Sequence, residues 1–226
     1  MSDPLRVFIG YDERQPLAFT VLSHSIARHS SVPVSITPLI LSQLPIKRRG
    51  LTTFTYSRFL VPFLCGYRGV ALFLDADMVV TGDIKNLFGQ SISQMAVHVM
   101  QEQPKFEWAS AMLFNNYICK NLTPEFVEDG SNKLFDLEWA RGRVGTLPPE
   151  WNHCVGYAKP KEAKLYHYTQ GLPCLIEPAG LSEDQHWHAE FDAAIHTVPW
   201  SELMGNSVHA EPVMRRFKER NEHAYH

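Results

Sequence analysis

The sequence predicts an α/β fold: a single Rossmann-like domain whose mostly parallel central sheet has helices on both faces. Three observations support this fold class. With 226 residues, of which 45% are hydrophobic, the chain can bury a large core without disulfides or a structural metal. Short apolar runs alternate with helical patterns along its first half. Polar loops follow directly after two of those runs, where α/β sheets bind ligands.

The first half of the chain predicts three strands and two helices. Arg6–Gly10 is a short apolar run ending in glycine, and a helical pattern follows over Leu17–Ala27. The β-branched residues of Val32–Leu41 predict a second strand. Apolar and aromatic residues recur at helical intervals over Thr52–Leu64. The five consecutive apolar residues of Val70–Leu74 are typical of a strand buried on both faces.

The second half of the chain has weaker patterns. Met95–Met100 and Ser110–Phe114 predict strands, and Thr123–Trp139 predicts a helical region. After Gly142 prolines interrupt the sequence repeatedly, so we expect a loop-rich segment there. The basic tail Met214–His226 predicts a solvated helix, with peripheral contact to an anionic membrane as the alternative.

Composition excludes several classes of function. Lys and Arg number 21 and Asp and Glu number 24, so the net charge of −3 gives no basic footprint for nucleic acid. The polar start of the chain has no readable signal peptide, which favours a cytoplasmic location. The longest apolar stretch, Phe59–Val80, contains Arg68, Asp75 and Asp77 and is therefore not expected to span a bilayer.

Asp75 and Asp77 stand at the carboxyl end of the predicted buried strand. Two carboxylates one residue apart can both face the edge of the sheet and bind one hard divalent cation. The alternative is that acidic residues simply end the strand, but the apolar residues on both sides disfavour it. The loop Gly10–Asp12 follows the first strand, so we expect it at the same edge.

The turn Asp75-Ala76-Asp77 resembles the Asp-x-Asp motif of nucleotide-sugar glycosyltransferases with the glycosyltransferase A (GT-A) fold, most closely the retaining family 8 enzymes. Further stretches resemble that family in the same order along the chain. They are Val7–Asp12, Tyr56–Arg58, Phe106–Asn115, Leu147–Asn152 and His167–Pro173. The resemblance covers about residues 6 to 175, which is most of the chain.

The resemblance implies a divalent cation, Mn²⁺ or Mg²⁺, and a UDP-sugar donor. It implies that Asp77 and His167 bind the metal directly and that Asp75 bridges the metal and the ribose. The residues it assigns to the nucleotide sugar are Gly10, Tyr11, Asp12, Arg58, Asp75, Ala76 and Gly171. It places Arg58, Asp136 and Glu138 near the reacting sugar as catalytic residues.

The activity implied is transfer of a hexose from the UDP-sugar to an acceptor hydroxyl with retention of configuration. The acceptor would be a carbohydrate, a lipid-linked sugar or a protein. Residues 1–115 would form the nucleotide-sugar-binding half, 116–200 the loop-rich half that completes the acceptor and metal sites, and 201–226 a C-terminal helix or tail.

The sequence departs from the family pattern in three places. Gln15 stands where the family has a base-stacking tyrosine, so Tyr11 is the alternative ring. The usual lysine after Gly171 is missing. The family's Asp-Gln-Asp acceptor motif has no clean copy, and Asp136-Leu137-Glu138 is the nearest match. These departures leave open a nucleotide-sugar-binding protein with degenerate catalysis.

A second alternative is a haloacid dehalogenase-type phosphohydrolase, whose nucleophile also lies in an Asp-x-Asp motif. Asp75 would then attack phosphorus and Asp77 would act as the acid. That motif normally ends the first strand of its fold, whereas two strand and helix units precede Asp75 here.

Overall fold

A computed structural model of the chain describes two β-sheets. It covers residues 3–89, 94–102, 105–157, 159, 161–174, 181–195 and 207–223, without the side chains of 106 and 217–223. In spatial order the six-stranded sheet contains β2 (Val34–Leu39), β1 (Leu5–Gly10), β3 (Val70–Leu74), β6 (Ala111–Asn115), β5 (Val97–Val99) and β7 (Val144–Thr146). The three-stranded sheet contains β4 (Met78–Val80), β9 (Leu165–His167) and β8 (Trp151–Cys154).

The large sheet is mixed but mostly parallel. β1 pairs in parallel with β2 and β3, and β5 pairs in parallel with β7, whereas β6 runs antiparallel to both of its neighbours. The predicted fold class is therefore confirmed, with β6 as the reversed strand. β2 is an edge strand, and it contains Pro38, a residue that sheets tolerate at their edges.

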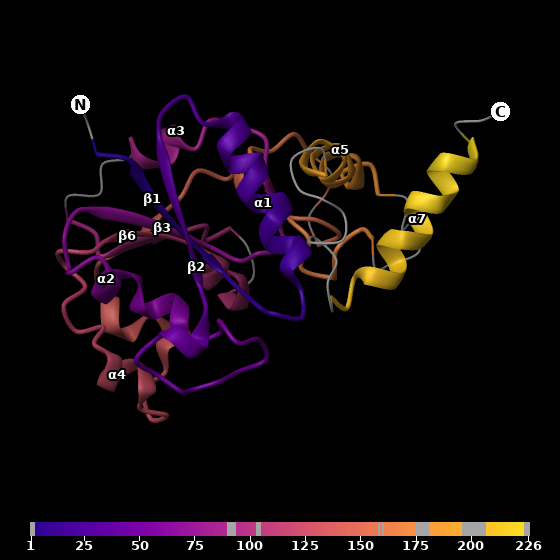
Figure 1. Cartoon of the computed structure of the whole chain (residues 1–226). Coiled ribbons are helices and arrows are strands. Elements are labelled where there is room, and N and C mark those ends of the chain that lie inside the picture. Colours follow the sequence, from indigo (N-terminus) through magenta and orange to yellow (C-terminus); the bar gives the residue numbers. More distant parts are fainter. Residues whose placement is uncertain are drawn as a thin grey trace.

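Helices cover both faces of the large sheet (Figure 1). The α-helices are α1 (Pro16–His29), α2 (Val61–Leu64), α3 (Lys85–Phe88), α4 (Pro124–Glu128), α5 (Asp184–Ala194) and α7 (Ala210–His223). The 3₁₀ helices are η1 (Leu41–Gln43), η2 (Ser57–Leu60), η3 (Lys105–Ser110), η4 (Leu134–Asp136) and η5 (Glu138–Ala140). α1 lies on one face, and α2 and α4 lie on the other.

Alternation along the strands creates two hydrophobic cores. In β3, Leu72 and Leu74 belong to the core under α1, whereas Phe73 belongs to the core under η2, α2 and α4. Successive side chains of a strand point to opposite faces, so a continuous apolar run such as Val70–Leu74 supplies both cores at once.

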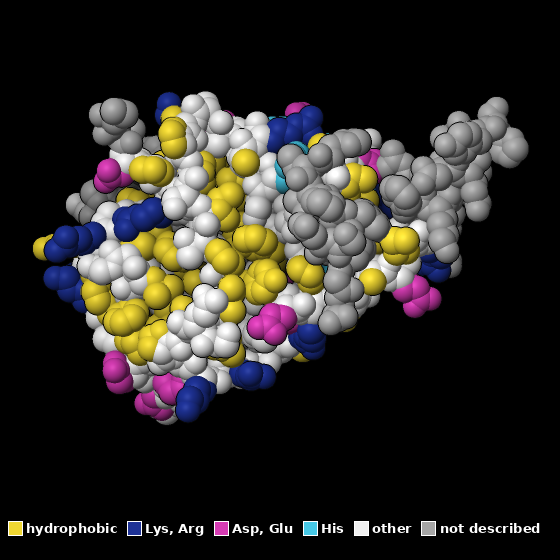
Figure 2. Space-filling model, in the orientation of Figure 1, with side chains coloured by type: hydrophobic (Ala, Val, Ile, Leu, Met, Phe, Trp, Pro, Cys, Tyr) yellow, Lys and Arg dark blue, Asp and Glu magenta, His cyan; other side chains and the backbone are white. Residues whose placement is uncertain are grey.

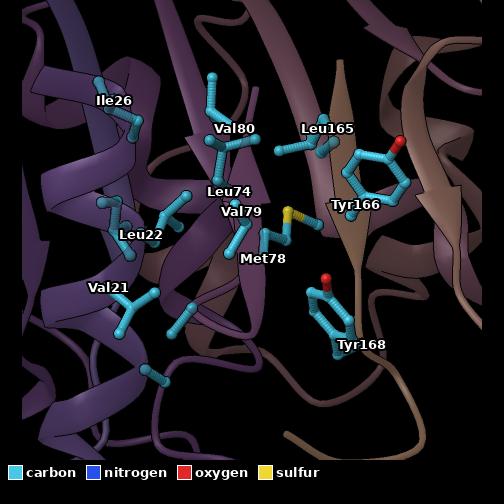
Figure 3. Packing of buried hydrophobic residues seen from close by; sticks show 14 of the residues in the cluster. Val21, Leu22, Ile26, Leu74, Met78, Val79, Val80, Leu165, Tyr166 and Tyr168 are labelled. Atoms are coloured by element: carbon cyan, nitrogen blue, oxygen red, sulfur yellow. The ribbon is translucent and has the colours of Figure 1, made fainter. Parts of the chain in front are cut away.

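The small sheet packs beside α1. Figure 3 shows Leu22 and Ile26 of α1 on one side of β4, and Leu165 and Tyr166 of β9 on the other. The amide of Val80 also donates a hydrogen bond to Ser25 Oγ at 3.1 Å. These contacts fix β4, and with it the turn that joins β3 to β4.

Three regions differ from the sequence predictions of local structure. The region Thr123–Trp139 is not one helix: α4 ends at Glu128, and only the short turns η4 and η5 follow. The backbone of Asp129, directly after α4, is extended with ψ of 113°, and Leu137 is left-handed with φ of 55°, so no helical hydrogen-bond ladder continues through either residue.

The segment after Gly142 contains more secondary structure than expected, since β7, β8, β9 and α5 all lie within it. The expected helix over Thr52–Leu64 is shorter, because turns occupy its first residues before η2 and α2 begin. Pro62 stands in the first turn of α2, where its missing N–H costs nothing.

The surface of the described residues has apolar and charged areas. On the face seen in Figure 2, apolar side chains gather in one broad area with Lys and Arg mainly around its margin.

No described helix is both long and apolar enough for a transmembrane segment. α7 carries Arg215 and Arg216, whereas the side chains of Lys218 and Arg220 lie outside the described residues, so membrane contact through this tail stays a prediction.

A buried carboxylate joins α5 to α1. Glu190 is only 3% exposed and contacts His24, Arg28 and His29 of α1. The Arg28 Nη1 to Glu190 Oε2 distance is 3.3 Å. Because a buried carboxylate is costly without partners, these basic groups determine how α5 sits on α1.

We expect Glu190→Ala to lower the free energy of unfolding by about 2 kcal/mol, because it removes the partner of several basic groups at a buried contact. Urea unfolding followed by circular dichroism measures this change. Gln185→Ala, at an exposed position of the same helix, should stay within about 0.5 kcal/mol of the wild type. Equal effects of the two variants would contradict this role of Glu190.

Candidate active site

The end of β3 places Asp75 and Asp77 at the edge of the large sheet. The amide of Asp75 donates to Ser110 O at 2.9 Å, so the turn is held against the start of β6. β4 begins at Met78, directly after the second carboxylate. The two acids therefore lie in a two-strand connection that is fixed at both ends.

The pairing of β4 with β9 brings His167 to these acids. Met78 stands opposite His167 in the antiparallel register, and the amide of Tyr168 donates to Asp77 O at 2.9 Å. His167 Nε2 lies 3.3 Å from Asp77 Oδ1. Asp75, Asp77 and His167 each offer a ligand atom, and these atoms lie within 4.8 Å of one another. The structure thus brings together the three residues predicted to bind metal.

The chemistry of this cluster suits a divalent cation. Two carboxylates and one imidazole are ligands that Mn²⁺ accepts, and Mg²⁺ shares the preference for carboxylates. Asp75 Oδ1 is buried and accepts no hydrogen bond that meets the usual geometry within the described residues, and its ion-pair partner is Arg58, whose Nη2 lies 3.0 Å away. A carboxylate oxygen has two lone pairs, so Asp75 Oδ1 can pair with Arg58 and still offer a lone pair to a metal ion.

The electrostatics of the cluster also favour a bound cation. Burial raises the pKa of Asp75 to about 6, and the charge of Asp77 adds to this shift while Arg58 opposes it. Burial acts to lower the pKa of His167, but Asp77 chiefly raises that pKa well above its usual value. A cation between the carboxylates would relieve their repulsion.

Arg58 is fixed on Asp75 by η2. Its Nη2 lies 3.0 Å from Asp75 Oδ1, and its Nη1 donates to Ala109 O at 2.7 Å. Its Nε donates to Thr55 O at 3.0 Å, and the guanidinium lies 4.9 Å from the ring centre of Phe73. The side chain is 8% exposed, so most of its donors are used within the protein. Its contact with a donor sugar stays a prediction.

Two residues that the sequence did not mark as candidates also lie at this site. Glu107 Oε2 lies 3.7 Å from His167 Nδ1, and burial raises the pKa of Glu107. Cys154 belongs with Glu107 and His167 to a second group of candidate ligands. Glu107 lies in the segment Phe106–Asn115, and nothing in its spacing along the chain marks it as a neighbour of His167.

A pocket of about 400 Å³ opens at the ends of β1 and β2. Its lining includes Tyr11, Asp12, Arg14, Leu41, Ser42, Arg49 and Thr53. Because Ile9 pairs with Leu74, this pocket and Asp75 lie at the same edge of the sheet. Tyr11 lines the pocket, whereas Gln15 stands at the N-cap of α1.

Asp12 is the buried acid of this pocket. Both of its carboxylate oxygens accept from Arg14: Oδ1 from Nε at 3.0 Å and Oδ2 from Nη2 at 2.7 Å. These hydrogen bonds lower the pKa of Asp12. Thr53 Oγ1 donates to Tyr11 O at 2.8 Å, which ties the loop to the opposite wall.

Two glycines of the predicted site have physical reasons to be glycine. A Cβ on Gly10 would lie 2.3 Å from the ring of Phe54, so only glycine lets the turn before η2 approach β1 this closely. Gly171 has φ of 117°, a region that side chains disfavour. Its neighbourhood includes Tyr168 and Gln170, which line a small cavity with it.

Glu138 and Asp136 lie outside both candidate metal groups of the described residues. Glu138 is exposed and pairs with Arg141, and Asp136 Oδ1 lies 3.3 Å from Lys105 Nζ. Leu137 between them turns left-handed. The structure therefore does not bring these two acids to Asp77, and their catalytic role stays a prediction.

We expect Arg58 and Asp75 to be strongly coupled. In a double-mutant cycle of Arg58→Met and Asp75→Leu, the coupling energy should be about 1–3 kcal/mol, because each single change leaves a buried charge unpaired. Urea unfolding in the presence of EDTA measures it without metal. The exposed pair Arg141 and Glu138 is the matched control, with coupling close to zero. Similar coupling in both pairs would show that burial does not strengthen the Arg58 contact.

No family model matches the chain. Among solved structures, the bifunctional glycosyltransferase WbbM superposes with a TM-score of 0.62 and 16% identity, covering 92% of this chain and 52% of WbbM. The glycosyltransferase GlyE of Streptococcus pneumoniae TIGR4 gives 0.64 and 14%, covering 89% of this chain and 64% of GlyE.

The galactosyltransferase LgtC, solved with donor and acceptor sugar analogs, gives a TM-score of 0.61 and 10% identity, covering 87% of this chain and 98% of LgtC. The chain thus spans about half of WbbM and less than two thirds of GlyE. At these identities the shared feature is the fold, which is the GT-A fold of glycosyltransferases.

One relative is much closer in sequence. Protein CDI of Arabidopsis thaliana is 34% identical over an alignment of 207 positions, and the match covers 75% of this chain and 79% of the relative. This chain therefore belongs to the same protein family as Protein CDI and has the GT-A glycosyltransferase fold.

Proposed function

We propose that this protein is a metal-dependent glycosyltransferase that moves a hexose from a UDP-sugar to an acceptor hydroxyl with retention of configuration. The observation that supports it best is the joining of Asp75, Asp77 and His167 at the ligand-binding edge of a GT-A sheet. These residues come from the Asp-x-Asp turn and from a strand almost ninety residues later. Strand pairing alone does not require such a chemically matched set.

The donor would lie across the edge of the large sheet. Tyr11 and Asp12 would contact the base in the 400 Å³ pocket, and Gly10 would let the chain pass close to Phe54 in the turn before η2. Because Arg14 already pairs with both oxygens of Asp12, the base would meet a paired carboxylate. The backbone at Ala76 and Gly171 would approach the ribose and the diphosphate.

Asp75, Asp77 and His167 would hold Mn²⁺ or Mg²⁺. When bound, the cation supplies a Lewis acid for the departing diphosphate. In the transfer, the acceptor oxygen forms a bond to the anomeric carbon as the bond from that carbon to the diphosphate breaks. UDP leaves with the electron pair, and the proton of the acceptor hydroxyl is released.

Other residues would act on the sugar or on the ligands. Arg58 would fix Asp75 and keep a positive charge beside the donor, in place of the lysine that is missing after Gly171. Glu138 and Asp136 would reach the reacting sugar only after leaving Arg141 and Lys105. The acceptor would be a carbohydrate, a lipid-linked sugar or a protein.

The two alternatives differ from this proposal in their fold or their product. The similarity to GT-A structures disfavours the haloacid dehalogenase alternative, which has a different fold. A nucleotide-sugar-binding protein with degenerate catalysis would share the same cluster and pocket. Release of UDP distinguishes it from an enzyme.

We expect the purified protein to release UDP from at least one UDP-sugar in the presence of Mn²⁺. The measurement is a coupled UDP assay over a panel of nucleotide sugars, with and without EDTA. Asp77→Asn should lower the rate by at least about 100-fold, since it removes a metal-binding charge.

Asp83→Asn is the matched control, because it makes the same chemical change at an acid that pairs with Ser31 outside the cluster. It should leave the rate unchanged. Donor binding without UDP release would favour the degenerate binding protein. Absence of both binding and release across the panel would reject the proposed function.

A further inference from the structure

Asn152 has an unusual backbone next to the cluster. It is fully buried in β8, and its φ is 118°, a value that residues other than glycine rarely adopt. The pairing of β8 with β9 is irregular at this point, because the register shifts between Trp151 and His153. Such strain persists only when surrounding contacts determine it, and it often occurs at functional sites.

The hydrogen bonds of Asn152 fix the orientation of its amide. Its Nδ2 lies 2.9 Å from Ser110 Oγ and 3.4 Å from Glu107 O. Ser110 Oγ donates its own proton to Glu107 O at 2.5 Å, so at Asn152 it acts as an acceptor. A carbonyl oxygen can only accept, and therefore the amide nitrogen must face this pair and Oδ1 must face away.

Asn152 Oδ1 then faces His167. The distance from Oδ1 to His167 Nδ1 is 3.1 Å, and both side chains are buried. Because Oδ1 has no proton to give, Nδ1 must carry the hydrogen of this bond. The other ring nitrogen, Nε2, lies 3.3 Å from Asp77 Oδ1 on the side of the predicted cation.

Other groups near Nδ1 are farther away. Glu107 Oε2 lies at 3.7 Å and Cys154 Sγ at 3.9 Å, so neither replaces the contact with Asn152. Histidine that binds a metal usually donates its second N–H to a fixed acceptor, which sets the ring orientation. Asn152 meets that requirement, and its hydrogen bond to Ser110 connects His167 to the end of η3, directly before β6.

We propose that Asn152 is a positioning residue that keeps a proton on Nδ1 of His167 and so presents Nε2 to the cation site beside Asp77. The strained backbone of Asn152 is what brings Oδ1 into reach. The role in metal binding rests on the proposed function, whereas the position of the proton does not.

Asn152→Gly tests this role without adding strain, since glycine adopts a φ of 118° easily. In the metal-free protein, proton NMR with ¹⁵N-labelled histidine should show a slowly exchanging Nδ1–H of His167 in the wild type and lose it in the variant. Mn²⁺ affinity, measured by electron paramagnetic resonance, should fall about 10-fold or more.

Asn116→Gly is the matched control. Asn116 is also fully buried, but its Nδ2 donates to Arg68 O away from the cluster, so the His167 signal and the Mn²⁺ affinity should stay at wild-type values. An unprotonated Nδ1 in the wild type, or an Nδ1–H signal that survives Asn152→Gly, would overturn the proposal. A wild-type protein that binds no Mn²⁺ would instead reject the metal role of the proposed function, and the NMR result would still decide the inference.

Discussion

The antiparallel pairing of β4 with β9 is the interaction on which the site depends. It sets Met78 opposite His167, and this register alone brings an imidazole from late in the chain to the acids that follow β3. α1 supports β4 from one side through the apolar contacts of Leu22 and Ile26. A shift of one residue would turn His167 to the other face of the small sheet, because side chains alternate along a strand.

The cluster also shows how a buried acid is kept in place. Asp75 is mostly buried beside the partly exposed Asp77, and burial together with the charge of Asp77 raises the pKa of Asp75. Arg58 offsets part of this cost, and its own guanidinium is held by backbone carbonyls from two segments. The remaining electrostatic cost is what a bound cation would remove. Geometry that is unfavourable without a ligand is typical of sites built to bind one.

Much of the fold was readable from sequence patterns. Val70–Leu74 is apolar at every position, and the structure buries it between two cores, so the prediction of a central strand is confirmed. The placement of Asp75 and the Asp12 loop at the same edge of the sheet was also predictable, because β1 and β3 are parallel and their carboxyl ends share that edge. The helix expected over Thr123–Trp139 failed, because apolar residues at helical spacing do not reveal a left-handed backbone such as that of Leu137.

By itself the sequence determined the α/β class, the carboxylates after a buried strand and the order of motifs, because hydrophobic period and short spacing are local properties. Only the tertiary structure decided that Glu107 and Asn152 meet His167, and that Glu138 and Asp136 stand apart from it. Those relations depend on the register of the small sheet and on one irregular pairing in β8. Strand register is set by packing between distant segments, and no local pattern in the chain encodes it.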